Sequence, residues 1–267
     1  MFGVNQRGMG TFTTDDGLHI AFEDWGGAGS GPPVVLHHGF IADGRLNWLY
    51  GGVVDAFTAA GRRVIAPDAR GHGRSDKPHD PAFYGEDRMS RDLGLLLDHL
   101  DLDQIDLVGY SMGAIVSLIT ASRDRRVRRM VVGGVGCAVV ESGGVERRMI
   151  DGDQLVQGLL TDDPSWITDP VARQFREFAD AIPGNDRKAL AAQATAVHRG
   201  GVDLAAITAP TLLIAGRDDP LASRPEVLVG AIPGAKLLVV DGDHMVALGD
   251  PRFVPAMVGF LSEASEA

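Results

Sequence analysis

A serine, a pair of aspartates and a histidine follow one another along this chain in the order of a nucleophile, an acid and a base. Ser111 stands at the centre of a Gly-Tyr-Ser-Met-Gly pentapeptide, and the pair Asp218-Asp219 and then His244 come later in the chain. A serine hydroxyl is a weak nucleophile at neutral pH, and it needs an adjacent base that an acid orients. The residue types and their order therefore predict acyl transfer through a serine nucleophile.

Each of these groups follows a run of apolar residues that predicts a buried strand. The runs are residues 105–108 before the serine turn, 211–215 before the aspartates, and 237–240 before the histidine. Reacting groups collect at the carboxyl ends of the strands in a parallel sheet, so we expect the three to meet there. Asp218 and Asp219 both remain candidates at this point, because neighbouring side chains point in different directions and only one orients the imidazole.

The pentapeptide around Ser111 also predicts a specific local geometry. A strand, this turn and then the apolar helix expected over 114–121 make the arrangement called a nucleophile elbow. The turn is so tight that the residues two before and two after the serine meet neighbouring backbone, which explains Gly109 and Gly113. The alternative is a glycine-rich turn with an incidental serine, but the strand before it and the helix after it favour the elbow.

Acyl transfer also needs hydrogen-bond donors for the negatively charged oxygen that develops in the transition state. The main-chain N–H of Met112, at the start of the helix, is one predicted donor. The other is the N–H of Phe40, in the loop after the strand at residues 34–38, where Gly39 allows close approach to the substrate. His38 in this loop either positions it through its side chain or is a polar strand-end residue without a catalytic task.

Composition narrows the possible partners. The 267-residue chain has a formal net charge of −11, which argues against binding to nucleic acid or to an anionic membrane surface. Cys137 is the only cysteine, and neither a signal peptide nor an apolar run of about 18 residues occurs, so we expect a soluble, cytoplasmic protein. No spacing typical of a metal site or of a dinucleotide-binding loop occurs, and we expect no cofactor.

The order of elements predicts a sheet with one helical insertion. An N-terminal hairpin is followed by alternating apolar strands and helices, which indicates a mainly parallel sheet covered on both faces. Expected elements include a helix over 48–60 ended by Gly61, a helix over 89–100 and a strand over 127–135. Residues 137–201 break this rhythm without a convincing strand, and we interpret them as a helical lid inserted into a core of residues 1–136 and 202–267. Its bulky residues Trp166, Phe175 and Phe178 are the candidates to bind substrate. We expect most of the bulky side chains to pack inside the lid and one or two to line a pocket.

Taken together, these motifs resemble those of the α/β-hydrolases over nearly the whole chain. The segments that carry the resemblance are His38-Gly39, the Asp-x-Arg-Gly-x-Gly-x-Ser stretch at 68–75, the Ser111 elbow, residues 216–219 and residues 242–244. The resemblance implies an eight-stranded, mainly parallel sheet flanked by helices, with a helical lid. It also implies that the acid is the third residue after the glycine that closes its strand, which is Asp219. In the same family, the loop with His72 has a structural role.

The resemblance also bears on the reaction. The aspartate nucleophile of epoxide hydrolases and haloalkane dehalogenases is replaced here by Ser111, so the chain is similar to the branch of esterases, enol-lactonases, perhydrolases and C–C hydrolases. We expect a small or medium carboxylic ester or lactone as substrate. The alternatives are a C–C hydrolase of a diketone, which uses the same triad, and a perhydrolase or haloperoxidase. A non-catalytic binder of small molecules is disfavoured, because a binder needs no complete series of serine, acid and histidine.

Overall fold

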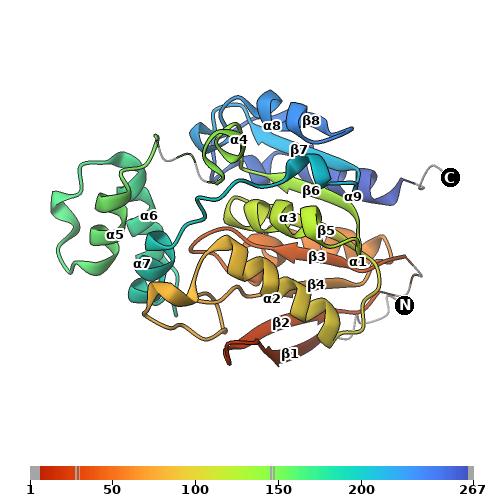
Figure 1. Ribbon diagram of the computed structural model, residues 1–267, viewed down its shortest axis with the longest axis horizontal. Helices are drawn as coiled ribbons and strands as arrows, with labels where there is room; N and C mark the ends of the chain where they lie inside the picture. Colours follow the sequence, from red (N-terminus) through yellow and green to blue (C-terminus); the bar gives the residue numbers. More distant parts are fainter. Residues whose placement is uncertain (1–6, 28, 30, 145, 147, 264–267) are drawn as a thin grey trace.

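One mixed sheet forms the centre of the molecule (Figure 1). The structure is a computed structural model that describes residues 7–263 apart from 28, 30, 145 and 147, and within them eight strands form one sheet in the order β1-β2-β4-β3-β5-β6-β7-β8. The N-terminal hairpin is antiparallel, β2 pairs antiparallel with β4, and all later pairings are parallel. The strands are β1 Arg7–Thr13, β2 His19–Trp25, β3 Val34–His37, β4 Val64–Pro67, β5 Ile105–Tyr110, β6 Val127–Gly133, β7 Thr211–Gly216 and β8 Lys236–Val240.

The helices divide between the two faces of the sheet and one insertion. They are α1 Val53–Ala59, α2 Glu86–His99, α3 Met112–Arg123, α4 Ala138–Ser142, α5 Gly152–Leu160, α6 Pro170–Ala181, α7 Arg187–Thr195, α8 Pro225–Ala231 and α9 Phe253–Ser262. Residues of α2, α3 and α8 join the hydrophobic cluster on one face, and residues of α1 and α9 join the cluster on the other. In the part of the chain that the structure describes, no helix combines the length and the apolar character that crossing a membrane requires.

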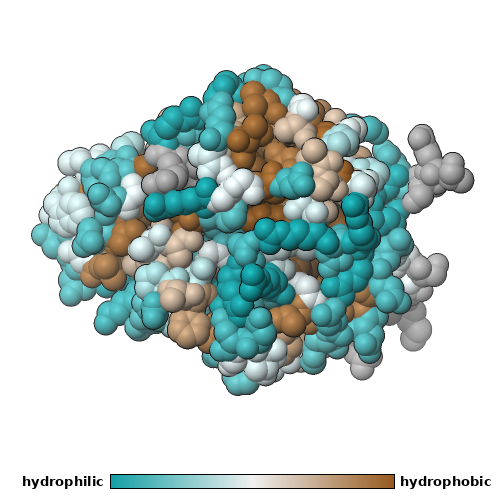
Figure 2. Space-filling view, in the orientation of Figure 1, coloured by the Kyte–Doolittle hydropathy of each residue, from teal (hydrophilic) through white to brown (hydrophobic). Residues whose placement is uncertain are grey.

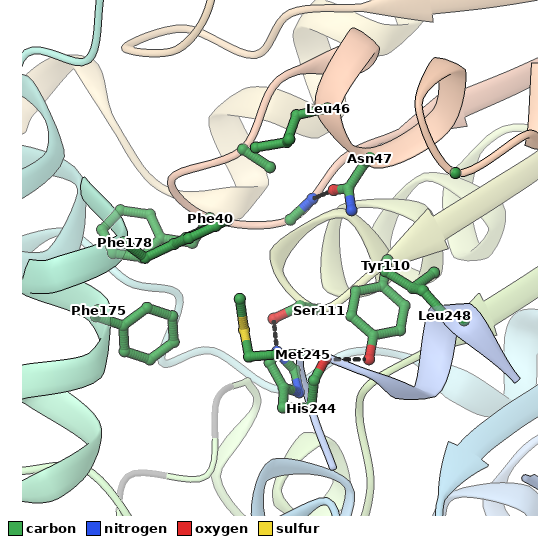
Figure 3. A pocket seen from close by; sticks show the side chains of 14 residues that line it. Phe40, Leu46, Asn47, Tyr110, Ser111, Phe175, Phe178, His244, Met245 and Leu248 are labelled. Carbon is green, nitrogen blue, oxygen red and sulfur yellow. Dashed lines mark hydrogen bonds between the residues drawn. The ribbon is translucent and has the colours of Figure 1, made fainter. Parts of the chain in front are cut away.

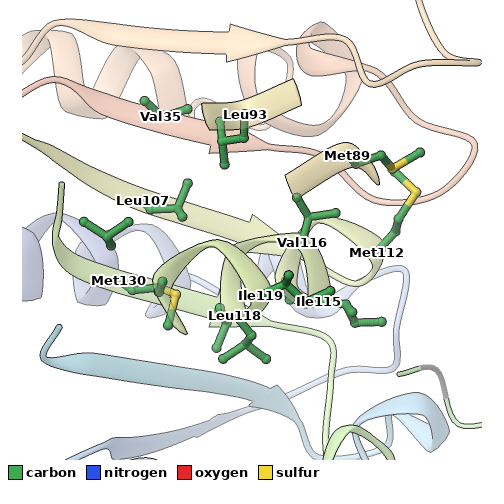
Figure 4. Packing of buried hydrophobic residues seen from close by; sticks show 14 of the residues in the cluster. Val35, Met89, Leu93, Leu107, Met112, Ile115, Val116, Leu118, Ile119 and Met130 are labelled. Atoms are coloured by element: carbon green, nitrogen blue, oxygen red, sulfur yellow. The ribbon is translucent and has the colours of Figure 1, made fainter. Parts of the chain in front are cut away.

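The alternation of side chains along the strands explains why helices cover both faces of the sheet. Val35 of β3 packs on the α2–α3 face, whereas its neighbours Val34 and Leu36 pack on the α1–α9 face. Figure 4 shows Val35 and Leu107 of the strands beside Leu93 of α2 and Val116 of α3. Because both faces are covered, the central strands β3, β4, β5 and β7 are buried at every position, and their mainly apolar residues make them recognisable in the sequence.

Three expected elements differ from the structure. The helix expected over 48–60 is a short π-helical turn, Arg45–Leu49, followed by α1, because Gly52 has a φ of 74° and breaks the helical path before Gly61 ends it. The strand expected over 127–135 ends at Gly133, since Gly134 has a φ of 69°. The helix expected over 89–100 starts earlier, at Glu86. Its first turn is acidic, which suits a helix N-terminus but adds no apolar residues to the helical spacing.

The helices α4, α5, α6 and α7 lie between β6 and β7 and fall within residues 137–201, the predicted helical lid, which is called the insertion below. In Figure 1 its helices α5, α6 and α7 lie at the left end of the molecule, whereas α4 lies beside α8 on the core. The described residues of this insertion contain helices and turns but no strand. Apolar side chains of α5, α6 and α7 pack together in a separate cluster with Ile41 from the loop after β3. Figure 2 accordingly shows a mostly hydrophilic outer surface on the insertion, with scattered hydrophobic residues.

Candidate active site

Ser111 lies in a strained turn between β5 and α3. Its backbone φ of 53° and ψ of −116° place a non-glycine residue in a conformation that costs energy and that persists only when the surroundings hold it. A Cβ on Gly109 would lie 2.2 Å from the carbonyl oxygen of Gly113, and a Cβ on Gly113 would lie 2.1 Å from that of His37. Both glycines are therefore required by close backbone approach, as the pentapeptide predicted.

The structure brings the predicted nucleophile, base and acid into one hydrogen-bonded chain. Figure 3 shows the first contact of this chain, between Ser111 and His244. His244 Nε2 lies 2.9 Å from Ser111 Oγ, and His244 Nδ1 lies 2.9 Å from Asp219 Oδ2. With the proton on Nδ1 donated to the carboxylate, Nε2 presents its lone pair to the serine hydroxyl. This is the geometry in which the imidazole can take the hydroxyl proton as the serine attacks.

Asp219, and not its neighbour Asp218, contacts the imidazole of His244. The Asp219 carboxylate is buried, and its second oxygen, Oδ1, accepts hydrogen bonds from the N–H groups of Leu221 at 2.8 Å and Ala222 at 3.3 Å. These two donors fix the plane of the carboxylate. Asp218 is exposed at the end of β7 and makes no contact with His244 among the hydrogen bonds of the described residues.

Tyr110 holds the loop that carries the base. Its phenol donates a hydrogen bond of 2.6 Å to the main-chain carbonyl of His244, and the two rings lie 5.3 Å apart. Burial, together with the negative charges of Asp219 and Asp243, raises the pKa of the phenol, so it stays protonated as a donor. No sequence pattern marks this residue, because the elbow motif leaves the position before the serine unspecified.

The loop after β3 brings the second predicted oxyanion donor to the site. Among the described residues, no backbone or side-chain acceptor pairs with the N–H of Phe40 or of Met112, so both remain open to a ligand. The N–H of Gly39 is engaged differently, since it donates a 2.7 Å hydrogen bond to Asn47 Oδ1. Asn47, in the π-helical turn, fixes the loop conformation. No sequence motif marked it, because its partner is a main-chain group eight residues away.

Three buried histidines lie in or against this loop. The ring of His38 packs against the rings of His37 and His72. His38 Nε2 accepts a 2.9 Å hydrogen bond from the N–H of Ala69, so its Nδ1 carries the proton that is donated to the Gly39 carbonyl at 2.8 Å. Burial lowers the pKa of His38 and of His72 and holds the pKa of His37 at about 3, so all three are neutral. The side chain of His38 therefore positions the loop, which decides between the two interpretations left open by the sequence.

A cavity of about 290 Å³ opens above Ser111. Phe175 and Phe178 of α6 line it across from Tyr110 and His244, and Figure 3 shows both rings near Phe40 at the side of the insertion. Trp166 lies elsewhere: its exposed fraction is 43 %, and it is not among the described residues that line the cavities at Ser111. The structure thus brings two of the three expected aromatic residues to the serine and leaves the third on the surface.

The charges around the cavities are acidic or neutral. Asp218 and Asp243 line a side cavity of about 230 Å³ next to His244, and Glu86 lines a smaller one next to Ser111. The described residues lining these three cavities include no lysine or arginine. The described residues also contain no group of three or more His, Cys, Asp or Glu side chains placed to hold a metal ion.

Comparison with known proteins places this site in a family. Residues 32–176 match the family model of the alpha/beta hydrolase fold, which covers more than half of the chain. The chain therefore belongs to the α/β-hydrolase family, whose members typically carry a catalytic triad, as the sequence motifs implied.

Individual relatives differ in their named reactions. The chain is 34 % identical to a 2-hydroxy-6-oxo-2,4-heptadienoate hydrolase of Pseudomonas putida, over 82 % of both proteins. It is 31 % identical to a non-heme chloroperoxidase of Kitasatospora aureofaciens, over 94 % of this chain and 98 % of the relative. Its fold is similar to that of an esterase from Exiguobacterium antarcticum, with a TM-score of 0.76, 25 % identity, and coverage of 95 % of this chain and 99 % of the esterase. These three relatives are all enzymes, and their named activities differ.

Proposed function

We propose that this protein is a serine hydrolase that cleaves a small or medium, uncharged carboxylic ester or lactone through an acyl-enzyme. The observation that carries the proposal is the chain of two 2.9 Å contacts from Ser111 Oγ through His244 to the buried Asp219. A site that only binds a ligand has no need of a serine held in a strained turn within hydrogen-bond distance of an imidazole.

The arrangement supports the following reaction. Ser111 Oγ attacks the carbonyl carbon while His244 Nε2 takes the hydroxyl proton, and the N–H groups of Phe40 and Met112 bind the resulting oxyanion. When the intermediate collapses, the bond between the carbonyl carbon and the leaving oxygen breaks, and His244 gives its proton to that oxygen. A water molecule then attacks the acyl-enzyme by the same route, which releases the carboxylic acid and regenerates the serine. Each oxyanion donor contributes about 3 kcal/mol to the transition state.

The size and charge of the cavity support the substrate class. A volume of about 290 Å³ is at the lower end for sites that bind drug-sized molecules, and its lining is mainly apolar with Phe40, Phe175 and Phe178. A negatively charged substrate would meet only acidic or neutral groups among the described lining residues, and burying its charge without a partner is unfavourable. An uncharged ester or lactone avoids this cost.

A C–C hydrolase is the second candidate, and the 34 % identity to the heptadienoate hydrolase favours it. The same triad can cleave a carbon–carbon bond beside a ketone. The substrate named for that relative is a carboxylate, however, and no lysine or arginine lines the cavities here within the described residues. Perhydrolysis is a variant of the ester reaction, in which hydrogen peroxide instead of water attacks the acyl-enzyme. The similarity to a chloroperoxidase is the reason to test for it.

Initial rates on p-nitrophenyl esters of increasing acyl length, with the wild type beside Ser111→Ala, test the proposal. We expect nitrophenol release that peaks at a short or medium acyl length and is lost in the variant. No release by the folded wild type, together with cleavage of a vinylogous diketone, would move the assignment to a C–C hydrolase. Faster consumption of the acyl-enzyme by hydrogen peroxide than by water would identify a perhydrolase.

A further inference from the structure

A small inner cavity lies beside the nucleophile and is lined differently from the main one. Its volume is about 50 Å³, and Ser111, Met112 and Phe40 line it, but His244 is not among its described lining residues. The main cavity and the side cavity next to it are both lined by His244. Two polar side chains, Glu86 of α2 and Gln193 of α7, also line the inner cavity, whose other walls are mainly apolar.

The position of the base decides which half of the substrate enters this cavity. His244 must give its proton to the leaving oxygen, so the leaving group has to lie on the side of the imidazole. In the proposed reaction the carbonyl oxygen binds between the N–H groups of Phe40 and Met112. Both residues line the inner cavity, so the remaining, acyl half is directed towards it. Because the cavity has room for only a few water-sized groups, the acyl half that it receives is short.

Gln193 carries an amide whose hydrogen-bonding capacity is not used up by the protein. Its exposed fraction is 1 %, and its Oε1 accepts from the N–H of Gly85 at 3.3 Å. In the described part of the chain, the contact of its Nε2 is with the sulfur of Met112 at 3.9 Å, which is a weak acceptor. A buried amide N–H without a good acceptor is costly, and a ligand oxygen in the inner cavity would relieve that cost.

Glu86 adds a second buried polar group to the lining of the cavity. Its exposed fraction is 1 %, and its Oε2 accepts a 2.5 Å hydrogen bond from the N–H of His198 after α7. Burial raises the pKa of this carboxyl to about 7, so near neutral pH it can donate as well as accept. The neighbouring titratable groups are the His198 imidazole and Asp87, the next residue of α2, which is paired with Arg123.

We propose that Glu86 and Gln193 form an acyl subsite that selects short, uncharged acyl groups bearing a carbonyl or hydroxyl oxygen over purely aliphatic ones. The inference rests on the proposed ester hydrolysis and specifies its substrate class. The amide of Gln193 donates to the acyl oxygen, and the carboxyl of Glu86 donates to a carbonyl or accepts from a hydroxyl. A carboxylate in the same place is repelled by ionised Glu86 and meets no lysine or arginine among the described lining residues.

A matched pair of substrates tests the subsite. The ratio of kcat/KM for p-nitrophenyl 4-oxopentanoate to that for p-nitrophenyl pentanoate is measured in the wild type and in Gln193→Met and Glu86→Met. We expect a ratio of about 10 in the wild type, which corresponds to one good hydrogen bond, and a ratio near 1 in both variants. Because both substrates are measured on the same enzyme, a general loss of activity cancels from the ratio. Gln104→Met, an exposed position ahead of β5, is the matched control and keeps the wild-type ratio.

The outcomes separate the two proposals. A ratio near 1 in the wild type, or a high ratio that persists in Gln193→Met and Glu86→Met, would overturn the subsite even if both variants fold poorly. If the pentanoate ester is hydrolysed in a Ser111-dependent manner, ester hydrolysis stands whatever the ratio. If neither ester is cleaved by the folded wild type, ester hydrolysis fails, and the subsite fails with it.

Discussion

The sheet core and the helical insertion bury their apolar residues in different ways. The core has two extensive clusters, one on each face of the sheet, with side chains such as Leu36 and Val35 completely buried. The insertion has one small cluster of α5, α6 and α7, and its aromatic residues Phe175 and Phe178 are only partly buried, with one side towards the cavity. The candidate reacting groups therefore lie on elements of the fully packed core, whereas the insertion contributes half-buried side chains to the wall of the cavity.

The strongest test of this division is the removal of the nucleophile from the core. Ser111→Ala should lower kcat/KM for a p-nitrophenyl ester by at least about 10⁴-fold, because nothing else in the proposed mechanism forms the acyl-enzyme. The free energy of unfolding should change by less than about 1 kcal/mol, since the Cβ remains and only a partly exposed hydroxyl is lost. Activity above a few per cent in purified Ser111→Ala would contradict the assignment of the nucleophile.

The neighbouring aspartates provide a matched pair at the end of β7. Asp219→Asn should reduce kcat by about 10³- to 10⁴-fold, because an amide in place of Oδ2 no longer holds the imidazole in the reactive tautomer. Asp218→Asn should change kcat by less than about fivefold, since that carboxylate is exposed and does not contact His244. Steady-state kinetics of the two variants at the same pH make the comparison, and similar losses in both would remove Asp219 from the triad.

The contact between core and insertion at Glu86 predicts a pH dependence of stability. Burial raises the pKa of this carboxyl from 4.5 to about 7, so the folded state binds a proton that the unfolded state releases. The free energy of unfolding therefore falls as the pH rises from about 4.5 to about 7. This group contributes a loss of about 3 kcal/mol, at about 1.4 kcal/mol for each pH unit. Glu86→Gln, which cannot ionise, should lack this loss. Urea unfolding at pH 5 and pH 8 checks it, and equal pH dependence in both proteins would refute it.

Within the insertion, the smallest effects should separate cavity walls from surface. Phe178→Ala should raise KM about tenfold and change kcat by less than about threefold, because it removes binding surface that does not touch the reacting atoms. Trp166→Ala is the control of similar size, and its 43 % exposed side chain predicts a change in KM of less than about twofold. A large change in kcat for Phe178→Ala would show that the insertion takes part in positioning the reacting groups.

The same contrast explains what the sequence could predict. Central strands covered on both faces are mainly apolar, so the sheet and its order of strands and helices are readable from the sequence. The candidate triad residues are recognisable because they stand just past the ends of strands. Gly109 and Gly113 were informative because the turn around Ser111 admits no side chain at these positions.

Other features depend on contacts between distant segments and have no local signal. Asn47, Tyr110 and Gln193 act through main-chain or sulfur partners that lie far along the chain or outside any motif. The break at Gly52 was missed because apolar residues on both sides of it continue the helical spacing. Trp166 was expected in the pocket because bulky residues suggest a wall, but periodicity does not tell which side of a small helical cluster faces the substrate.

The hydrogen bond from Tyr110 to the carbonyl of His244 has a consequence for redesign. Tyr110 precedes Ser111 in the chain and also anchors the loop of His244. The positions of the candidate nucleophile and base therefore depend on the same residue. Exchanging or reshaping residues 137–201 leaves that support in place, because neither partner belongs to them. New substrate preferences can therefore be sought by exchanging the insertion on this core while the geometry between Ser111 and His244 is kept.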